Sequence, residues 1–399
     1  MKNFEFHAYT DILFGEGQVE HLADKLSKYG NKVLMVYGGG SIKKNGIYEA
    51  VKNALKGFEI TELGGVEPNP KITSVREGVK LCREHGVEVV LAVGGGSTID
   101  CAKAIAGAFY YNGDAWDIVE DSSLITEVLP VVSVLTIAAT GSEMNKNAVI
   151  SDMDSNKKLG TSSMKFIPQV SVLDPTYTYG VPALQTASGA ADIMSHVFEN
   201  YFKSEPDTFI QDRICEAILE TCIHYCPIAL QNPQDYAARA NLMWASTLAL
   251  NGLCGAGKAQ SWSCHPIEHE LSAFYDITHG VGLAIVTPSW MRHILNEKTV
   301  DRFVDFAINV WHLSATEVKA GKVLISDPME VKMALANRAI DKLEHFFEKC
   351  GLPMSLSELG IGTEHMKEMS EAAVAHGNLA NAYVPLDASD VEEILTECI

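Results

Sequence analysis

The sequence predicts two domains: an α/β domain with a mostly parallel sheet over residues 1–180, and an all-helical domain over residues 181–399. A chain of 399 residues is long enough for two or three domains. Strand and helix signals alternate through the first part, which is typical of parallel strands joined by right-handed helical crossovers. Helical spacing then replaces them, and the change falls between Asp174 and Pro182, where two prolines bracket a short connection.

Short apolar runs that end at glycine-rich turns predict the strands of the first domain. Lys32–Tyr37 ends at Gly38-Gly39-Gly40-Ser41, and Val87–Val93 ends at Gly94-Gly95-Gly96-Ser97. The second run is almost uninterrupted, as in a strand covered on both faces. Further strands are expected at Phe58–Leu63, Val131–Ile137 and Val170–Leu173, and helices at Ile42–Leu55, Thr73–His85 and Thr98–Ala108.

Long segments with helical spacing make up the second domain, and β-branched alternation largely disappears from it. The expected helices are Leu184–Phe202, Phe209–Cys226, Tyr236–Leu253, His279–Leu295, Val300–Trp311 and Val331–Cys350.

Composition and charge exclude several classes of partner. Apolar residues make up 47% of the chain and charged residues 21%, which are values of a globular protein. The formal charge of −20 disfavours nucleic acid and anionic membranes, because both are polyanions. No segment reaches the roughly 18 uninterrupted apolar residues of a spanning helix. The first residues have no signal-peptide core, so a cytoplasmic location is expected.

The nine cysteines are expected to be reduced thiols, because their number is odd and no signal segment is seen. Cys222 and Cys226 flank His224 at a spacing that would suit a metal pair. Small apolar residues four apart are also what a buried helix face contains, and we favour that interpretation.

Two glycine-rich turns suggest a phosphate-binding site. Gly94-Gly95-Gly96-Ser97 joins a buried strand to a helix start, where backbone N–H groups and the helix N-terminus attract an anion. A tight turn without a ligand is the alternative. The usual G-x-G-x-x-G fingerprint is absent. Lys43 and Lys44 follow the other turn where an NAD site often has an acid, so NADP(H) is predicted in preference to NAD(H).

Histidines and an aspartate form a candidate metal site. Asp192 and His196 are four apart in a helical stretch and so share one face. His265 and His269 are also four apart, and His279 follows soon after. Three imidazoles and a carboxylate suit a divalent cation. A lone buried histidine usually just has a satisfied hydrogen bond. The residues from His265 to His269 also match the H-x-x-E-H motif of inverted zinc peptidases, but that interpretation leaves the other ligands without a role.

Several motifs in order resemble the iron-containing (group III) alcohol dehydrogenases, within the butanol-dehydrogenase-like subgroup. One runs from Ser171 through Pro182 to Gly189-Ala190-Ala191-Asp192, then His196 and Glu199, and another spans His265, His269 and His279-Gly280. The Gly-Gly-Gly-Ser-x-x-Asp element ends at Asp100, and Thr140 to Glu143 is a Thr-Gly-Ser-Glu element. The resemblance implies a Rossmann-like parallel sheet followed by a helical domain, the dehydroquinate-synthase-like architecture.

The resemblance also implies roles for individual residues. It makes four residues metal ligands: Asp192, His196, His265 and His279. It makes His269 a non-ligand with a possible role in proton relay or cofactor contact. It places the following residues around the cofactor: Gly39, Gly40, Ser41, Asn69, Gly95, Gly96, Ser97, Asp100, Thr136, Thr140, Asn145, Lys158 and Tyr177.

The activity implied is metal-dependent hydride transfer between NAD(P)(H) and a short- to medium-chain primary alcohol or aldehyde, as in butanol dehydrogenases and aldehyde reductases. Fe²⁺ is expected, although Zn²⁺ and Ni²⁺ bind such a site more tightly. The partners expected are a small-molecule substrate and a second copy of the chain in a homodimer, with no nucleic acid and no membrane. Three alternatives are a dehydroquinate-synthase-like lyase, a protein that binds metal or nucleotide without catalysis, and the zinc peptidase.

Overall fold

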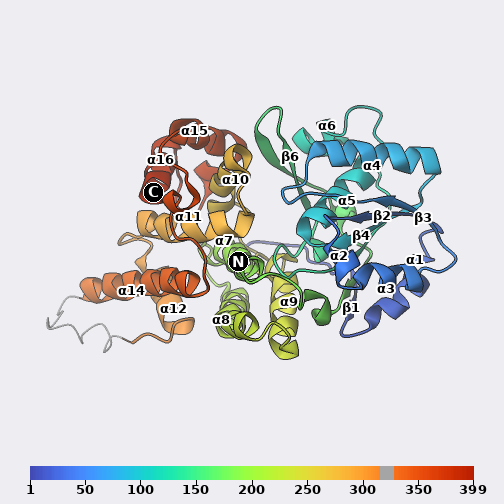
Figure 1. Cartoon of the computed structure of the whole chain (residues 1–399). Helices are drawn as coiled ribbons and strands as arrows, with labels where there is room; N and C mark the ends of the chain where they lie inside the picture. The colour runs from blue at the N-terminus through green and yellow to red at the C-terminus, as the bar shows by residue number, and fades with distance from the viewer. Residues whose placement is uncertain (315–327) are drawn as a thin grey trace.

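The computed structural model describes residues 1–314 and 328–399, which form two bodies side by side (Figure 1). All the strands lie between Asp11 and Leu173, and from Ala183 onward every element that the structure describes is a helix. The predicted fold class, a parallel α/β domain followed by a helical domain, is therefore confirmed.

The sheet has six strands in the order β1-β8-β5-β4-β2-β3, and every neighbouring pair is parallel. Its strands are β1 (Asp11–Phe14), β2 (Lys32–Tyr37), β3 (Glu59–Leu63), β4 (Val89–Gly94), β5 (Val131–Leu135) and β8 (Val170–Leu173). Because the strands are parallel, the turns after β2, β4, β5 and β8 all lie at one edge. That edge faces the helical domain (Figure 1).

Both faces of the sheet are covered. Alternate residues of β2 point to opposite sides, so that Leu34 and Val36 belong to one apolar cluster and Val33 and Met35 to another. The helices of this domain are α1 (Leu22–Leu26), α2 (Ser41–Lys44), α3 (Ile47–Ala54), α4 (Ile72–His85), α5 (Gly96–Ala108) and α6 (Asp117–Glu120). α4 and α5 pack on the first face, and α1 and α3 on the second (Figure 1).

Two local expectations for this domain are wrong. The single helix expected from Ile42 to Leu55 is two helices, α2 and α3, because the chain turns at Gly46 with φ of 81°. The sequence analysis also missed an antiparallel hairpin, β6 (Asn147–Asp152) and β7 (Lys157–Ser162). Its residues are largely polar, and it lies outside the main sheet, so no apolar run marks it.

The second domain packs around α7. Its helices are α7 (Ala183–Tyr201), α8 (Phe209–Gln231), α9 (Tyr236–Leu250), α10 (Cys264–Tyr275), α11 (His279–Ile294), α12 (Val300–Asn309), α14 (Pro328–Lys349), α15 (Met366–His376) and α16 (Ala388–Glu397). From Thr186 to Tyr201 every residue of α7 is buried, because α8, α9, α10 and α11 all contact it. α10 was not predicted; its sequence mixes charged, polar and apolar residues and has a proline in the first turn.

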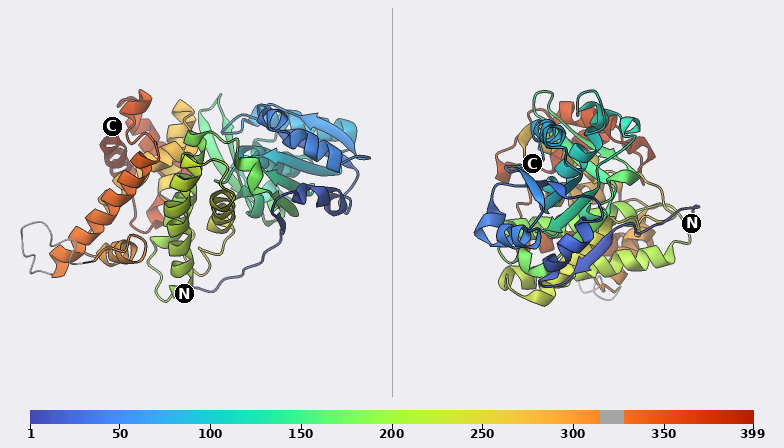
Figure 2. Two further views of the ribbon diagram at one scale, coloured as in Figure 1. Left: turned by 60° about the horizontal axis from the view of Figure 1, so that its bottom comes forward. Right: turned by 90° about the vertical axis from the view of Figure 1, so that its right-hand side faces the viewer.

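The N-terminal segment, residues 1–10, has no regular structure and runs along the outside of both domains (Figure 2). Its first residue donates from the ammonium group to the Pro206 carbonyl at 2.7 Å, and Lys2 N–H donates to the Gly257 carbonyl at 2.9 Å. The segment therefore begins on the helical domain and ends at β1. All nine cysteines are buried free thiols, as expected. Among the described residues, no helix is both long and apolar enough to cross a membrane.

Candidate active site

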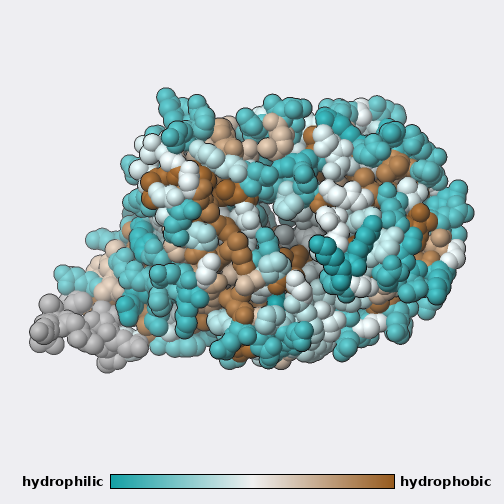
Figure 3. All heavy atoms as spheres, viewed as in Figure 1, coloured by the Kyte–Doolittle hydropathy of each residue, from teal (hydrophilic) through white to brown (hydrophobic). Residues whose placement is uncertain are grey.

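A cavity of about 760 Å³ lies between the two domains. Figure 3 shows a hollow between the two bodies on the face turned to the viewer. Its walls include residues predicted for the cofactor, namely Asn69, Ser97, Asp100, Thr140, Asn145 and Lys158. They also include the four histidines His196, His265, His269 and His279. The fold thus brings six of the predicted cofactor residues and all three predicted histidine ligands into one space, while Asp192 is not among the residues that line it.

The glycine turn after β4 opens α5 at this edge. Gly95 is extended, and Gly96 is the first residue of the helix. A Cβ on Gly96 would lie 2.3 Å from side-chain atoms of Thr140, and one on Gly95 would lie 2.3 Å from Ile137. These glycines are therefore needed for close packing between neighbouring turns, whether or not a phosphate binds there. By contrast, apart from the adjoining residues, no described part of the chain lies within 4 Å of a Cβ placed on Gly39 or Gly40.

A buried lysine that the sequence analysis missed holds the polar loop after β5. Lys103, on α5, is fully buried, and its Nζ donates to Ser142 Oγ at 2.8 Å and to the carbonyls of Asn145 and Asn147 at 2.9 and 2.8 Å. Burial lowers the pKa of Lys103 to about 8. Ser142 Oγ in turn donates to Asp100 at 2.5 Å. The hydrogen bonds of Lys103 therefore hold the loop that carries Thr140 and Asn145 in place.

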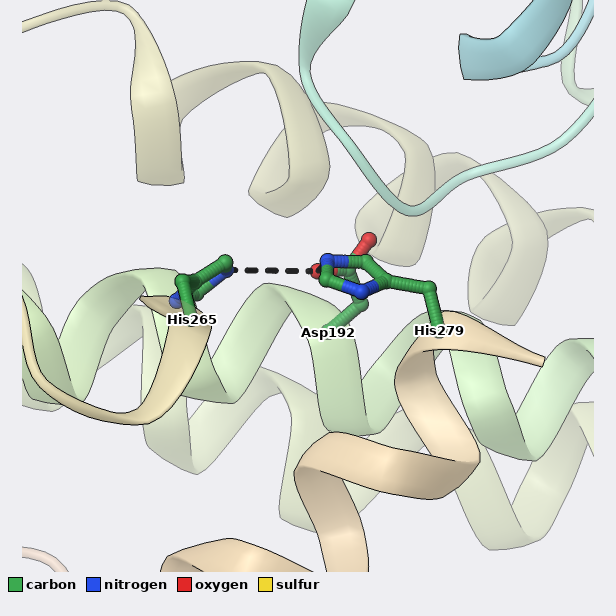
Figure 4. A group of neighbouring side chains, drawn as sticks. All are labelled: Asp192, His265 and His279. Carbon is green, nitrogen blue, oxygen red and sulfur yellow. Dashed lines mark ion pairs between the residues drawn. The ribbon is translucent and has the colours of Figure 1, made fainter. Parts of the chain in front are cut away.

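The three predicted histidine ligands converge on Oδ1 of the fourth, Asp192, and the ligand atoms of Asp192, His265 and His279 all lie within 4.8 Å of one another. Asp192 and His196 lie one turn apart on α7, His265 is on α10, and His279 begins α11. The Nε2 atoms of His196, His265 and His279 lie 3.5, 3.9 and 3.8 Å from Asp192 Oδ1. Figure 4 shows the ion-pair contact from His265 to Asp192, with the ring of His279 close to the same carboxylate in this view. The ring of His279 is the most accessible, with 24% of its side chain exposed.

These atoms fit a divalent cation. Separations of 3.5–3.9 Å are too long for hydrogen bonds. They suit donors that each lie about 2 Å from a shared ion. Within the described residues, Asp192 Oδ1 and His265 Nε2 are buried and have no hydrogen-bond partner, and polar atoms in that situation are rare. The donor set of three imidazoles and one carboxylate is the kind that binds first-row divalent metals.

The charge of the group also suits a cation. Burial opposes ionisation of Asp192, but the neighbouring histidines outweigh it, so the pKa of the carboxyl lies below its usual value. Burial lowers the pKa of His196 to about 3, which keeps this ring neutral. Burial also disfavours a charged His265, but Asp192 and Glu199 raise the pKa of His265 to about 9. An ion that binds here therefore displaces a proton.

Three further side chains border this group. The ring of His269 lies 5.6 Å from that of His279, and burial holds its pKa well below the usual value. The Trp262 ring lies 4.6 Å from that of His265. Lys158 reaches across from β7 of the other domain, with Nζ 3.3 Å from Glu268 Oε2. Trp262 belongs to no motif that marks it as a site residue in the sequence.

A second contact joins the domains next to His279. Asp276 Oδ1 accepts from Asn69 Nδ2 at 3.0 Å and from Lys71 Nζ at 2.8 Å. Asn69 and Asp276 both have positive φ, 50° and 49°, a conformation that non-glycine residues rarely adopt. Two residues with unfavourable backbone conformations are thus hydrogen-bonded to each other, and one of them, Asp276, lies three residues before the candidate ligand His279. Neither Lys71 nor Asp276 belongs to a pattern that a sequence would reveal.

The remaining predicted cofactor residues lie outside the residues that line the cavity. They occur in turns at the carboxyl ends of the strands: Gly39, Gly40 and Ser41 after β2, Gly95 and Gly96 after β4, Thr136 after β5, and Tyr177 after β8. Tyr177 is partly buried against the apolar cluster on the α1 and α3 face of the sheet. Their roles stay predictions.

Comparisons with known proteins cover nearly the whole chain. The family model described as iron-containing alcohol dehydrogenase matches residues 10–175, and the C-terminal model of the Fe-containing alcohol dehydrogenase family matches residues 186–399. NADH-dependent butanol dehydrogenase A of Clostridium acetobutylicum is 51% identical, over 99% of each chain. The NADPH-dependent aldehyde reductase YqhD of Escherichia coli is 40% identical, over 94% of each. A crystal structure of NADH-dependent butanol dehydrogenase A from Thermotoga maritima matches with a TM-score of 0.91 and 39% identity, and the match covers 100% of this chain and 99% of that one.

Proposed function

The chain belongs to the iron-containing alcohol dehydrogenase family, and from this membership we propose that it transfers hydride between NAD(P)(H) and a short- to medium-chain primary alcohol or its aldehyde. The observation that carries the proposal is that His196, His265 and His279, whose Nε2 atoms all lie within 4 Å of Asp192 Oδ1, line the same cavity as Ser97, Asp100 and Thr140. A metal-activated substrate and a dinucleotide would meet there.

We assign the residues as follows. Asp192, His196, His265 and His279 hold one divalent ion, with Fe²⁺ expected, and Gly95, Gly96 and Ser97 bind the pyrophosphate at the start of α5. When bound, the ion polarises the substrate oxygen as a Lewis acid, and the nicotinamide donates or accepts the hydride. A ring nitrogen of His269 moves the proton of the substrate oxygen, and the Trp262 ring shields the ligand histidines from water.

The proposal is tested by mixing the protein with NADPH and butyraldehyde and following absorbance at the nicotinamide band. We expect oxidation of the cofactor that requires added Fe²⁺ or Zn²⁺ and stops when a chelator removes the metal. A protein that oxidises no cofactor with any aldehyde of a short-chain panel, in the presence of either metal, would contradict it.

For the cofactor we propose a preference for NADP(H), with NAD(H) also used. Relatives that are named for NADH and for NADPH both match this chain. The support comes from Lys43, which follows the glycine turn after β2 and donates to Tyr37 Oη at 2.9 Å. Glu62 accepts from the same hydroxyl at 3.0 Å and from Lys52 at 3.1 Å, so an acid lies beside the lysine.

These contacts predict the direction of two substitutions. Lys43→Ala should lower kcat/KM for NADPH about tenfold or more with little change for NADH, because a charge-assisted hydrogen bond to phosphate contributes about 1.5–3 kcal/mol. Glu62→Gln should shift the ratio toward NADPH, because it removes a negative charge that repels the phosphate. Steady-state kinetics with both cofactors measures the ratios. Equal losses for the two cofactors in Lys43→Ala would place Lys43 outside the phosphate site.

For the assembly we propose a homodimer. The N-terminal segment exposes three aromatic side chains, Phe4, Phe6 and Tyr9, each more than 40% accessible. An extended segment with exposed apolar side chains is suited to pairing with a second copy. The mass in solution, measured by light scattering, distinguishes a dimer from a monomer.

The peptidase alternative has no support in the geometry. A peptidase would need Glu268 as a base facing water, yet its side chain is fully buried and bonded within the protein. The relatives named above are dehydrogenases and a reductase, and none of them is a lyase or a peptidase.

A further inference from the structure

The glutamate of the H-x-x-E-H motif has no part in the chemistry proposed above. Glu268 lies on α10 between the ligand His265 and the non-ligand His269, and no part of it is exposed. A buried carboxylate is costly unless charged and hydrogen-bonded partners compensate it. Its partners are His279 Nδ1 and Lys158 Nζ on one oxygen and Ser272 Oγ on the other. The Glu268 carboxylate is therefore held in one orientation.

The contact with His279 determines which ring nitrogen can bind a metal. An ionised carboxylate only accepts hydrogen bonds, so the proton of the imidazole must lie on Nδ1, which faces Glu268 Oε2. Nε2 then carries the lone pair, and this nitrogen lies 3.8 Å from Asp192 Oδ1. Glu268 thus selects the tautomer and the ring orientation that a metal ligand needs.

Lys158 accounts for the charge of Glu268. Its ammonium, 4% exposed, lies 3.3 Å from Glu268 Oε2 and 3.4 Å from His279 Nδ1. Glu268, His269 and His279 could by themselves hold a second cation. The Lys158 ammonium already supplies a positive charge beside these three residues, so we expect one metal ion and not two. Lys158 lies on β7, in the first domain. Glu268, the partner of His279, is therefore itself bound by a residue of that domain.

His265, another ligand, has the same arrangement. Its Nδ1 lies 3.3 Å from Glu199 Oε1, and Glu199 also accepts from the backbone N–H groups of Ser263 and His265 at 2.9–3.1 Å. The third ligand, His196, has no such partner, since its Nδ1 is buried without a hydrogen bond among the described residues. Two of the three imidazoles are therefore oriented by buried glutamates.

We propose that Glu268 is a positioning residue for the metal site, which holds His279 in its metal-binding tautomer as Glu199 holds His265. The proposal rests on the metal site assigned under the proposed function. Removal of such a partner in other metal sites weakens metal binding about 10–100-fold. Here the loss has a second cause, because Lys158 would remain beside the ion without its counter-charge.

The test is a titration of the metal-depleted full-length protein with Co²⁺, in competition with a coloured chelator, together with the visible absorption spectrum of the bound Co²⁺. Glu268→Gln keeps an acceptor but removes the charge, and we expect affinity about tenfold weaker. Glu268→Ala removes both, and we expect about a hundredfold loss and a changed Co²⁺ spectrum, because the His279 ring is no longer oriented.

Glu270→Gln is the matched control. Glu270 lies on the same helix, is 2% exposed and binds a histidine in the same way, with Oε1 2.8 Å from His376 Nδ1, but that histidine is not a ligand. We expect it to keep the affinity and spectrum of the natural protein. If folded Glu268→Gln, checked by circular dichroism, also keeps both, the proposal is overturned, even where Glu268→Ala fails to fold. If the natural protein binds no Co²⁺, the metal site itself is wrong.

Discussion

His265→Ala is expected to lose its metal and its dehydrogenase activity together while the protein stays folded. His265 Nε2 is buried and faces Asp192, and it has no hydrogen-bond partner in the described part of the chain. Three ligands would remain after its removal. Because Lewis-acid stabilisation contributes several kcal/mol to the transition state, we expect turnover to fall about a thousandfold or more. Mass spectrometry measures the metal content, and NADPH oxidation with butyraldehyde measures the activity. Circular dichroism shows whether the variant is folded.

A control separates this effect from the general loss of a histidine. His224 is exposed on α8 and its ring packs on that of Tyr225, so His224→Ala should keep both metal and activity. A metal-free His265→Ala protein that still oxidised alcohols at the natural rate would show that the ion has no part in catalysis.

Gly280→Ala is expected to destabilise the protein and weaken metal binding together. α11 approaches α7 at this position so closely that an added Cβ would lie 2.1 Å from the Ser188 carbonyl oxygen. Backbone atoms cannot move aside as a side chain does, so the two helices must separate. Overpacking of this kind costs about 3 kcal/mol, and it moves His279, the preceding residue, away from Asp192.

Urea unfolding of the metal-depleted protein and Co²⁺ titration of the folded one measure these two effects. Gly180→Ala is the matched control, because among the residues that the structure describes only the adjoining ones could come within 4 Å of its added Cβ, and its φ lies outside the left-handed region. We expect the control to unfold at the same urea concentration as the natural protein. An unchanged unfolding midpoint for Gly280→Ala would mean that α7 and α11 adjust without cost.

Elements that bury an apolar face could be predicted from the sequence. β2 and β4 are continuous apolar runs between turns, and α7 has a helical apolar stripe. These apolar patterns, which burial requires, predicted the three elements. The β6–β7 hairpin could not be predicted in this way, because a polar ribbon outside the sheet has no apolar run. α10 was missed for a related reason: its buried residues include His265 and Glu268, which read as surface residues in a sequence.

The same distinction between local pattern and distant contact applies to the candidate site. The four-residue spacing of Asp192 and His196 places both on one face of a helix, and the structure agrees. Contacts between distant segments produce no regular spacing in the sequence. Lys158 and Glu268 are 110 residues apart, and Lys71 and Asp276 are 205 apart, so only the packing of the two domains brings them together. For the same reason the sequence disfavours the peptidase motif but gives Glu268 no other role, because its contact with His279 exists only in the folded chain.

The path of the N-terminal segment restricts how the two domains can move. The chain passes between them twice: once from the anchor of Met1 at Pro206 to Asp11, and again between Leu173 and Ala183. A body attached at two separate points rotates most easily about the line that joins them. A hinge rotation about that axis would leave both connections in place, whereas a translation of one domain away from the other would stretch one of them.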